Sequence, residues 1–136
     1  MNIERLDHLV LTVRDLNATC TFYTQVLGMT LVTLAPEHPY LVFGTQRITL
    51  HVQGQTQALR ALQPVPGSAN LCLITAVPVP RLMQRLHHYG VRVIEGPLKR
   101  PGASGMLLSI YCRDPDGNLL ELANEVGDRP SDVDLS

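Results

Sequence analysis

The chain has 136 residues, of which 45% are hydrophobic and 17% are charged, and its formal net charge is −1. This composition excludes a disordered chain, and the length allows one domain or two fused half-domains with a buried core. The near-zero charge argues against nucleic-acid binding, and no apolar stretch is long enough to span a membrane.

The first module is expected over residues 1–54. Its apolar and turn patterns predict a strand over 6–13, a helix over 15–27, and strands over 29–34, 40–43 and 47–52. Asp15 is a suitable helix N-cap, and Gly28 can take the left-handed conformation that ends a helix.

A linker over 55–69 leads to a second module over 70–125, and a polar tail over 126–136 follows. The second module predicts a strand over 71–75, a helix from Pro80 to Gly90, a strand beginning within 91–94, a flexible loop over 97–105, and strands over 106–112 and 119–123. The stretch from Asp114 to Gly117 predicts a type I turn between the last two strands.

The two modules are an internal repeat. His8 precedes Gly28 by the same number of positions as Asn70 precedes Gly90, and the same kinds of element follow. The sequence therefore predicts an α+β fold of two βαβββ modules that curl into an incomplete barrel around a hollow. Such a hollow is a natural ligand site.

Three residues are candidates for metal binding: His8 in the first strand, His51 at the end of an apolar strand, and Glu121 among leucines. Two imidazoles and a carboxylate suit a divalent metal with open positions. A single histidine in a strand is more commonly a hydrogen-bonded structural residue, so spacing alone leaves both interpretations open.

Cys20, Cys72 and Cys112 are odd in number and have apolar neighbours and no metal-ligand spacing. This pattern predicts buried free thiols in a reducing compartment and hence a cytoplasmic protein.

The context of His8 in LDHLVLTV, the helix segment FYTQVLGM from Phe22 and the segment RDPDGNLLE from Arg113 to Glu121 resemble the vicinal oxygen chelate superfamily. This superfamily includes glyoxalase I, fosfomycin and bleomycin resistance proteins, and extradiol dioxygenases. The phrases around His51, Asn70 and Gly96 are most similar to small glyoxalase-domain proteins labelled dioxygenase-related or virulence-associated.

The resemblance implies a metal site whose first and last ligands match His8 and Glu121. His51 falls where many members have Glu, Gln or His, whereas Asn70 falls where most metal-dependent members have a second-module His. The implied site is either a three-ligand centre of His8, His51 and Glu121 with Asn70 nearby, or a relic that no longer holds metal.

The resemblance implies a metal-dependent enzyme that acts on a small substrate through two adjacent oxygens, either a glyoxalase-like lyase or an extradiol-dioxygenase-like enzyme. The metal would be zinc, nickel, manganese or iron(II), glutathione is a candidate cosubstrate, and Glu121 would be both ligand and base. A homodimer is also expected. The alternative is a metal-free binding protein of the bleomycin-resistance type.

Four further residues are candidates for binding the substrate: Asn70, Lys99, Arg100 and Tyr111. Lys99 and Arg100 would clamp an anionic group if the loop over 97–105 closes as a lid. A solvated basic loop is the alternative, and strand parity alone leaves the direction of Tyr111 open.

Overall fold

The structure is a computed structural model that describes residues 1–55 and 59–128. It divides into two compact units. The first unit contains Met1–Ala69 and the turn Asp114–Asn118, and the second contains Asn70–Arg113 and Leu119–Ser136. Within the described residues, no helix is long and apolar enough to cross a membrane.

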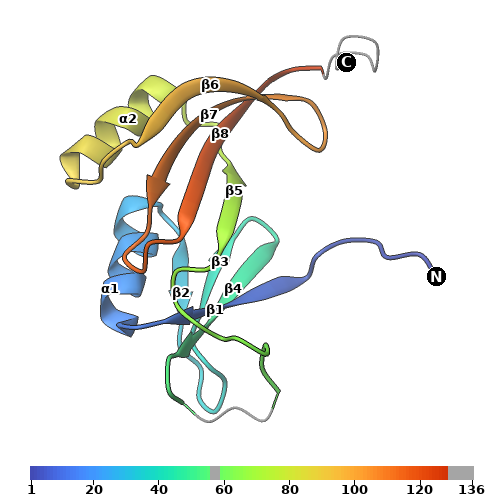
Figure 1. The fold of residues 1–136 in the computed structure, drawn as a ribbon, viewed down its shortest axis with the longest axis vertical. Coiled ribbons are helices and arrows are strands. Elements are labelled where there is room, and N and C mark those ends of the chain that lie inside the picture. Colours follow the sequence, from blue (N-terminus) through green and yellow to red (C-terminus); the bar gives the residue numbers. More distant parts are fainter. Residues whose placement is uncertain (56–58, 129–136) are drawn as a thin grey trace. The chain divides into compact units, whose positions relative to one another are not determined.

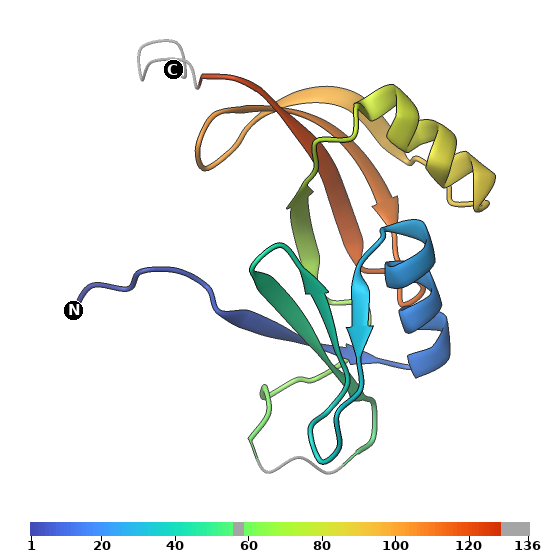
Figure 2. The same cartoon turned by 180° about the vertical axis from the view of Figure 1, so that it is seen from behind.

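The first unit is built on a four-stranded sheet in the order β1-β4-β3-β2 (Figure 1). Its elements are β1 (His8–Val13), α1 (Leu16–Thr21), η1 (Phe22–Val26), β2 (Thr30–Val32), β3 (Tyr40–Phe43) and β4 (Gln46–Val52). Strands β1 and β4 are parallel, and the other pairs are antiparallel. The segment before β1 runs away from this sheet (Figure 2), and its apolar side chains Ile3 and Leu6 are exposed.

The second unit repeats this plan with the strand order β5-β8-β7-β6. Its elements are β5 (Asn70–Ile74), α2 (Val79–His88), β6 (Glu95–Pro101), β7 (Met106–Arg113) and β8 (Leu119–Gly127). Strands β5 and β8 are parallel, as are β1 and β4. The predicted α+β fold of two βαβββ modules is therefore confirmed, and neither sheet closes into a barrel.

The helix predicted over 15–27 is two successive helices. The Asp15 side chain caps α1 by accepting a hydrogen bond of 3.0 Å from the Ala18 N–H, as its position predicted. From Phe22 the helix widens into the π-helical turn η1, in which the Leu27 N–H donates to the Phe22 carbonyl at 3.3 Å. Gly28 follows with a φ of +77°, which explains why the helix ends there.

The loop predicted over 97–105 is wrong for its first half, because β6 continues to Pro101 and pairs with β7. The loop was predicted from polar residues and from Gly102 and Gly105. Pro97 and Pro101, which cannot donate a backbone hydrogen bond, lie within the strand instead. Strand β6 is an edge strand, and Pro97 lies where its register shifts, so the missing donors break no ladder. Only Gly102–Gly105 remains as a short connection to β7.

Alternation along the strands gives each sheet a covered face and an open face. The covered faces carry the apolar core, and its fully buried side chains include Val13, Leu50, Ile110 and Leu120. On the open faces, β1 presents His8, Val10 and Thr12, and β5 presents Asn70, Cys72 and Ile74. The polar candidates of the sequence lie on these open faces, where a side chain meets solvent or a ligand and not the core.

Candidate functional site

Glu121 lies on the open face of the second sheet, near the start of β8. In the sheet register it stands between Cys72 of β5 and Tyr111 of β7. The Ser109 hydroxyl donates a hydrogen bond of 2.6 Å to Glu121 Oε2, and Ser109 itself is fully buried. This bond fixes one of the two carboxylate oxygens.

A hollow of about 580 Å³ opens beside this carboxylate, entirely within the second unit. Its polar and charged lining residues are Cys72, Arg100, Ser104, Tyr111, Glu121 and Glu125. The short connection Gly102–Gly105 forms one wall, and Leu107 supplies apolar surface. The hollow therefore combines a fixed carboxylate, one cation, a phenol and a thiol.

The two basic candidates of β6 lie on opposite faces of the sheet. Arg100 is in register with Leu107 and lines the hollow with Tyr111, as the prediction for these two residues requires. Lys99 is in register with Leu108, one position along, so its side chain starts from the other face. Lys99 is therefore not brought to Glu121. Adjacent residues in a strand point to opposite faces, whereas a flexible loop could have directed both side chains to the same site.

Cys72 corrects the prediction of three buried thiols. It is exposed on the open face, Cys20 is half-buried, and only Cys112 is buried. The Cys72 thiol is hydrogen-bonded to Glu121. Desolvation, the Glu121 charge and this bond together raise the pKa of Cys72 to about 11. The thiol is therefore protonated at neutral pH in the metal-free chain.

Asn70 is the first residue of β5 and is exposed on the same face as Cys72. It is in register with Leu119, two positions before Glu121, so Asn70 and Glu121 are diagonal neighbours. Asn70 is not among the residues that line the hollow. Its amide is placed to hydrogen-bond at the edge of the site.

His8 opens β1 on the open face of the first sheet, with a side chain that is 41% exposed. Its Nδ1 lies 2.8 Å from Asp7 Oδ2. The hydrogen bond with His8 is the main cause that lowers the pKa of Asp7, and the charge of His8 adds to it. When Nδ1 donates to the carboxylate, Nε2 keeps its lone pair, which is the arrangement of a histidine prepared to bind metal.

His51 is not brought to His8. It is in register with Thr12, and His8 is in register with Arg47, which places the two histidines at opposite ends of the β1–β4 pair, roughly 13 Å apart along the strands. His51 instead stacks against His38, with ring centroids 4.2 Å apart, and lines a separate hollow of about 340 Å³ in the first unit. Burial, and then the charge of His38, lowers its pKa.

The two histidines of the predicted three-ligand centre with Glu121 are thus not brought together on the first sheet. Glu121 belongs to the second unit, and the two histidines of the first unit are far apart. Across residues 1–55 and 59–128, no group of three or more His, Cys, Asp or Glu side chains is placed to hold one metal. His51 was chosen as an imidazole in an apolar strand and not for its register, and its role as a ligand stays a prediction.

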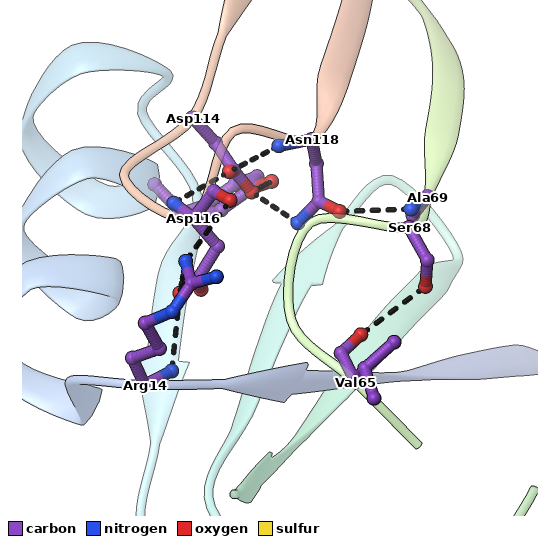
Figure 3. A network of polar contacts seen from close by, with 8 residues as sticks. Arg14, Val65, Ser68, Ala69, Asp114, Asp116 and Asn118 are labelled. Carbon is purple, nitrogen blue, oxygen red and sulfur yellow. Dashed lines mark hydrogen bonds and ion pairs between the residues drawn. The ribbon is translucent and has the colours of Figure 1, made fainter. Parts of the chain in front are cut away.

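A network of buried polar groups surrounds the turn between β7 and β8 (Figure 3). Asp114 Oδ1 accepts hydrogen bonds from the backbone N–H groups of Asp116 and Asn118, at 2.9 and 3.0 Å. Asp114 Oδ2 accepts from Asn118 Nδ2 at 2.8 Å and from the Tyr23 hydroxyl at 2.6 Å. Asp114 is therefore the centre of the turn, and Tyr23 anchors it to the helix η1.

The same turn is tied to residues at the beginning of β5 and the end of β1. Asn118 Oδ1 accepts from the Ala69 N–H at 2.8 Å, immediately before β5 begins (Figure 3). Asp116 Oδ1 accepts from the Arg14 N–H at 3.1 Å, immediately after β1 ends. Sequence analysis identified the turn but not this role of Asn118, although an Asx residue beside a turn is a signal for it. Asn118 holds the adjacent starts of β5 and β8, the strands that carry Cys72 and Glu121.

Comparison with known proteins decides the family. A model of the Glyoxalase/Bleomycin resistance protein/Dioxygenase superfamily matches residues 5–122. The chain belongs to this superfamily. The matched range includes His8 and Glu121.

Three relatives are similar to this chain over most of its length. Virulence protein STM3117 of Salmonella typhimurium is 46% identical over 126 residues, which cover 93% of this chain and 88% of the relative. Its crystal structure superposes with a TM-score of 0.88 over 93% of this chain and 100% of that one. Glyoxalase domain-containing protein RDO1 of Mycosarcoma maydis is 44% identical, over 91% of this chain and 70% of the relative. Glutathione transferase FosA of Serratia marcescens is 33% identical, over 88% and 80%.

Proposed function

We propose that this family member is a divalent-metal-dependent enzyme that acts on a small substrate through two adjacent oxygens. The observation that carries this proposal is the Glu121 carboxylate, which is held by Ser109 at 2.6 Å and faces a hollow of about 580 Å³. A charged carboxylate on a half-buried strand is costly unless it is paired, and the neutral Ser109 hydroxyl and Cys72 thiol beside Glu121 do not balance its charge. A metal would balance that charge.

The donor atoms fit a first-row divalent metal. His8 offers Nε2 because Nδ1 is engaged by Asp7, and Glu121 offers the oxygen that Ser109 does not occupy. Imidazole nitrogen and carboxylate oxygen are ligands for zinc, nickel, manganese and iron(II). His51 is left out of this donor set because it stacks on His38 at the far end of the strand pair.

The bound metal would supply Lewis-acid stabilisation of negative charge on the substrate oxygens. The chain's own groups do the remaining work. Glu121 is placed to accept or return a proton, and Ser109 keeps its carboxylate in one orientation. Arg100 and Tyr111 line the hollow and would orient an anionic or hydroxylated part of the substrate. Asn70 would donate a hydrogen bond at its edge.

Between the reaction classes, we favour a glyoxalase-type lyase or thiol transfer with glutathione as cosubstrate over ring cleavage. The support is the names of two relatives, a glyoxalase domain-containing protein and a glutathione transferase. Turnover assays with methylglyoxal and glutathione, with an epoxide and glutathione, and with catechols compare the three reactions after loading with each metal. Turnover only with a catechol and iron(II) would reverse this preference.

Metal analysis tests the proposal directly. Protein purified without chelator, and protein reconstituted with zinc, nickel or manganese, should hold stoichiometric metal. The variants His8→Ala and Glu121→Gln should each bind metal at least about tenfold more weakly. His87→Ala is the matched control, because this histidine is exposed on α2, and it should bind like the unaltered chain.

Absence of stoichiometric metal after reconstitution would contradict the enzyme proposal and favour the metal-free binding protein. Ligand binding with unchanged affinity in Glu121→Gln would support that alternative. The expected homodimer remains a prediction, which light scattering measures. Mixing His8→Ala with Glu121→Gln chains then asks whether partial metal binding returns, as it would if the two donors came from different subunits.

A further inference from the structure

Cys72 and Glu121 form a pair of metal-binding side chains on the open face of the second sheet. They are in direct register on the parallel strands β5 and β8. Both line the same hollow, and their side chains are hydrogen-bonded to each other. Nothing in the proposed function uses the thiol.

We propose that Cys72 is a metal donor beside Glu121. It would take the role of the second-module histidine, because this chain has Asn70 at the position of that histidine. This inference rests on the proposed metal and names a ligand for it that the family pattern does not include. The metal it selects is a thiophilic one, such as zinc or cobalt(II), over manganese.

Geometry allows the pair to bind one ion. Zinc lies about 2.3 Å from a thiolate sulfur and about 2.1 Å from a carboxylate oxygen, so the two donor atoms of a tetrahedral site are roughly 3.5 Å apart. Neighbouring strands are separated by about 4.8 Å, and side chains in equal register on one face converge easily to this distance. The two side chains are in direct register and line the same hollow, so one ion can reach both donor atoms.

The bond changes balance without any redox partner. The S–H bond of Cys72 breaks as the S–metal bond forms, the proton passes to solvent, and the sulfur keeps its oxidation state. Glu121 loses the thiol as a hydrogen-bond donor and keeps the bond from Ser109. The remaining positions of the metal are left for other donors, water and the substrate oxygens.

The other candidates for this role are less well placed. Asn70 shares the open face, but a neutral amide is a weak ligand for zinc or iron. Cys112 is fully buried on the covered face, and Cys20 is half-buried on α1. Neither lies in the hollow. Cys72 is thus the thiol that a metal at Glu121 would meet.

Cobalt(II) titration followed by absorption tests the inference, because a cobalt–thiolate bond gives a near-ultraviolet charge-transfer band that oxygen and nitrogen donors do not. The unaltered chain should show this band at one cobalt per chain. Cys72→Ser should lose the band and bind cobalt at least about tenfold more weakly. Cys20→Ser is the matched control and should keep both the band and the affinity.

Three other outcomes are decisive. A band that persists in Cys72→Ser would overturn the inference. Cobalt binding without a band in the unaltered chain would overturn it and leave the proposed metal enzyme standing. No cobalt binding at all would overturn both. Thermal unfolding of Cys72→Ser should match that of the unaltered chain, because Cys72 is exposed and a serine keeps its hydrogen bond to Glu121.

Discussion

The open faces of the two sheets share one topology and differ in chemistry. In the second sheet, Glu121 stands between Cys72 and Tyr111. At the corresponding place of the first sheet, Thr49 stands between Val10 and Tyr40. The repeat has thus kept the backbone register and the tyrosine, but only the second sheet has a carboxylate and a thiol. Duplication supplied a scaffold, and the donors are concentrated on one copy.

The first sheet carries one guanidinium and two imidazoles instead. The Arg47 guanidinium lies 4.4 Å from the centre of the Tyr40 ring, and His8 and His51 lie at the two ends of the strand pair. Such groups suit an anionic partner or a single imidazole–metal bond, and not a chelating cluster. The histidine that begins the first copy and the asparagine that begins the second therefore occupy equivalent positions in their sheets but have different register partners, Arg47 and Leu119.

The turns that close the two modules differ in the same way. The β3–β4 turn is short, and its Gly44 and Thr45 are exposed. The β7–β8 turn is held by the buried side chains of Asp114 and Asn118. We expect the second turn, which precedes Glu121, to be far more sensitive to substitution than the first.

Asp114→Ala should have the largest effect. The substitution removes the carboxylate that accepts four hydrogen bonds, two of them from the Tyr23 hydroxyl and the Asn118 side-chain amide. The expected cost is about 3 kcal/mol in the free energy of unfolding. Thr45→Ala in the first module's turn is the matched control and should change stability by less than about 0.5 kcal/mol. Urea unfolding measures both. Equal effects would remove the distinction between the turns.

Cys72 should react slowly with an alkylating reagent. Its pKa of about 11, against the usual 9.0, leaves about a hundredfold less thiolate at neutral pH, and the rate should rise as pH increases through 11. Glu121→Gln should accelerate the reaction by removing the neighbouring charge. Peptide mapping after timed alkylation separates Cys72 from Cys20. A midpoint at or below 9 would show that neither burial nor Glu121 raises the pKa of this thiol.

Tyr23→Phe should be milder than Asp114→Ala, because it deletes one donor and leaves the turn's internal hydrogen bonds. A loss of about 1.5 kcal/mol is expected, since the bond to the Asp114 carboxylate is short and charge-assisted. Tyr40→Phe on the first sheet keeps the ring under Arg47 and should cost less than about 0.5 kcal/mol. A larger loss of unfolding free energy in Tyr40→Phe than in Tyr23→Phe would contradict this expectation.

His38→Ala should have the smallest effect and act only on the first sheet. Burial lowers the pKa of His51 first, and the charge of His38 lowers it further. Removing His38 should therefore raise the pKa of His51 toward its usual value and also expose the ring. NMR titration of the histidine resonances measures this, with His87→Ala as the control. A pKa that falls would show that the stacked ring at 4.2 Å stabilises the charged form.

Local sequence was sufficient for the topology of this chain. Asp15, Gly28 and Gly90 mark helix ends through side-chain capping and positive φ, effects that depend only on neighbouring residues. The repeat of the modules and the family motifs are likewise read along the chain. They led to the two βαβββ modules and to the superfamily that residues 5–122 match.

Only the tertiary structure decided which candidates share a site. Arg100 faces the hollow and Lys99 does not, Cys72 is exposed beside Glu121, and His51 lies far along the strands from His8. Each outcome depends on strand register. A shift of one residue moves a side chain to the opposite face, and the register is set by hydrogen bonds between segments that are distant in sequence.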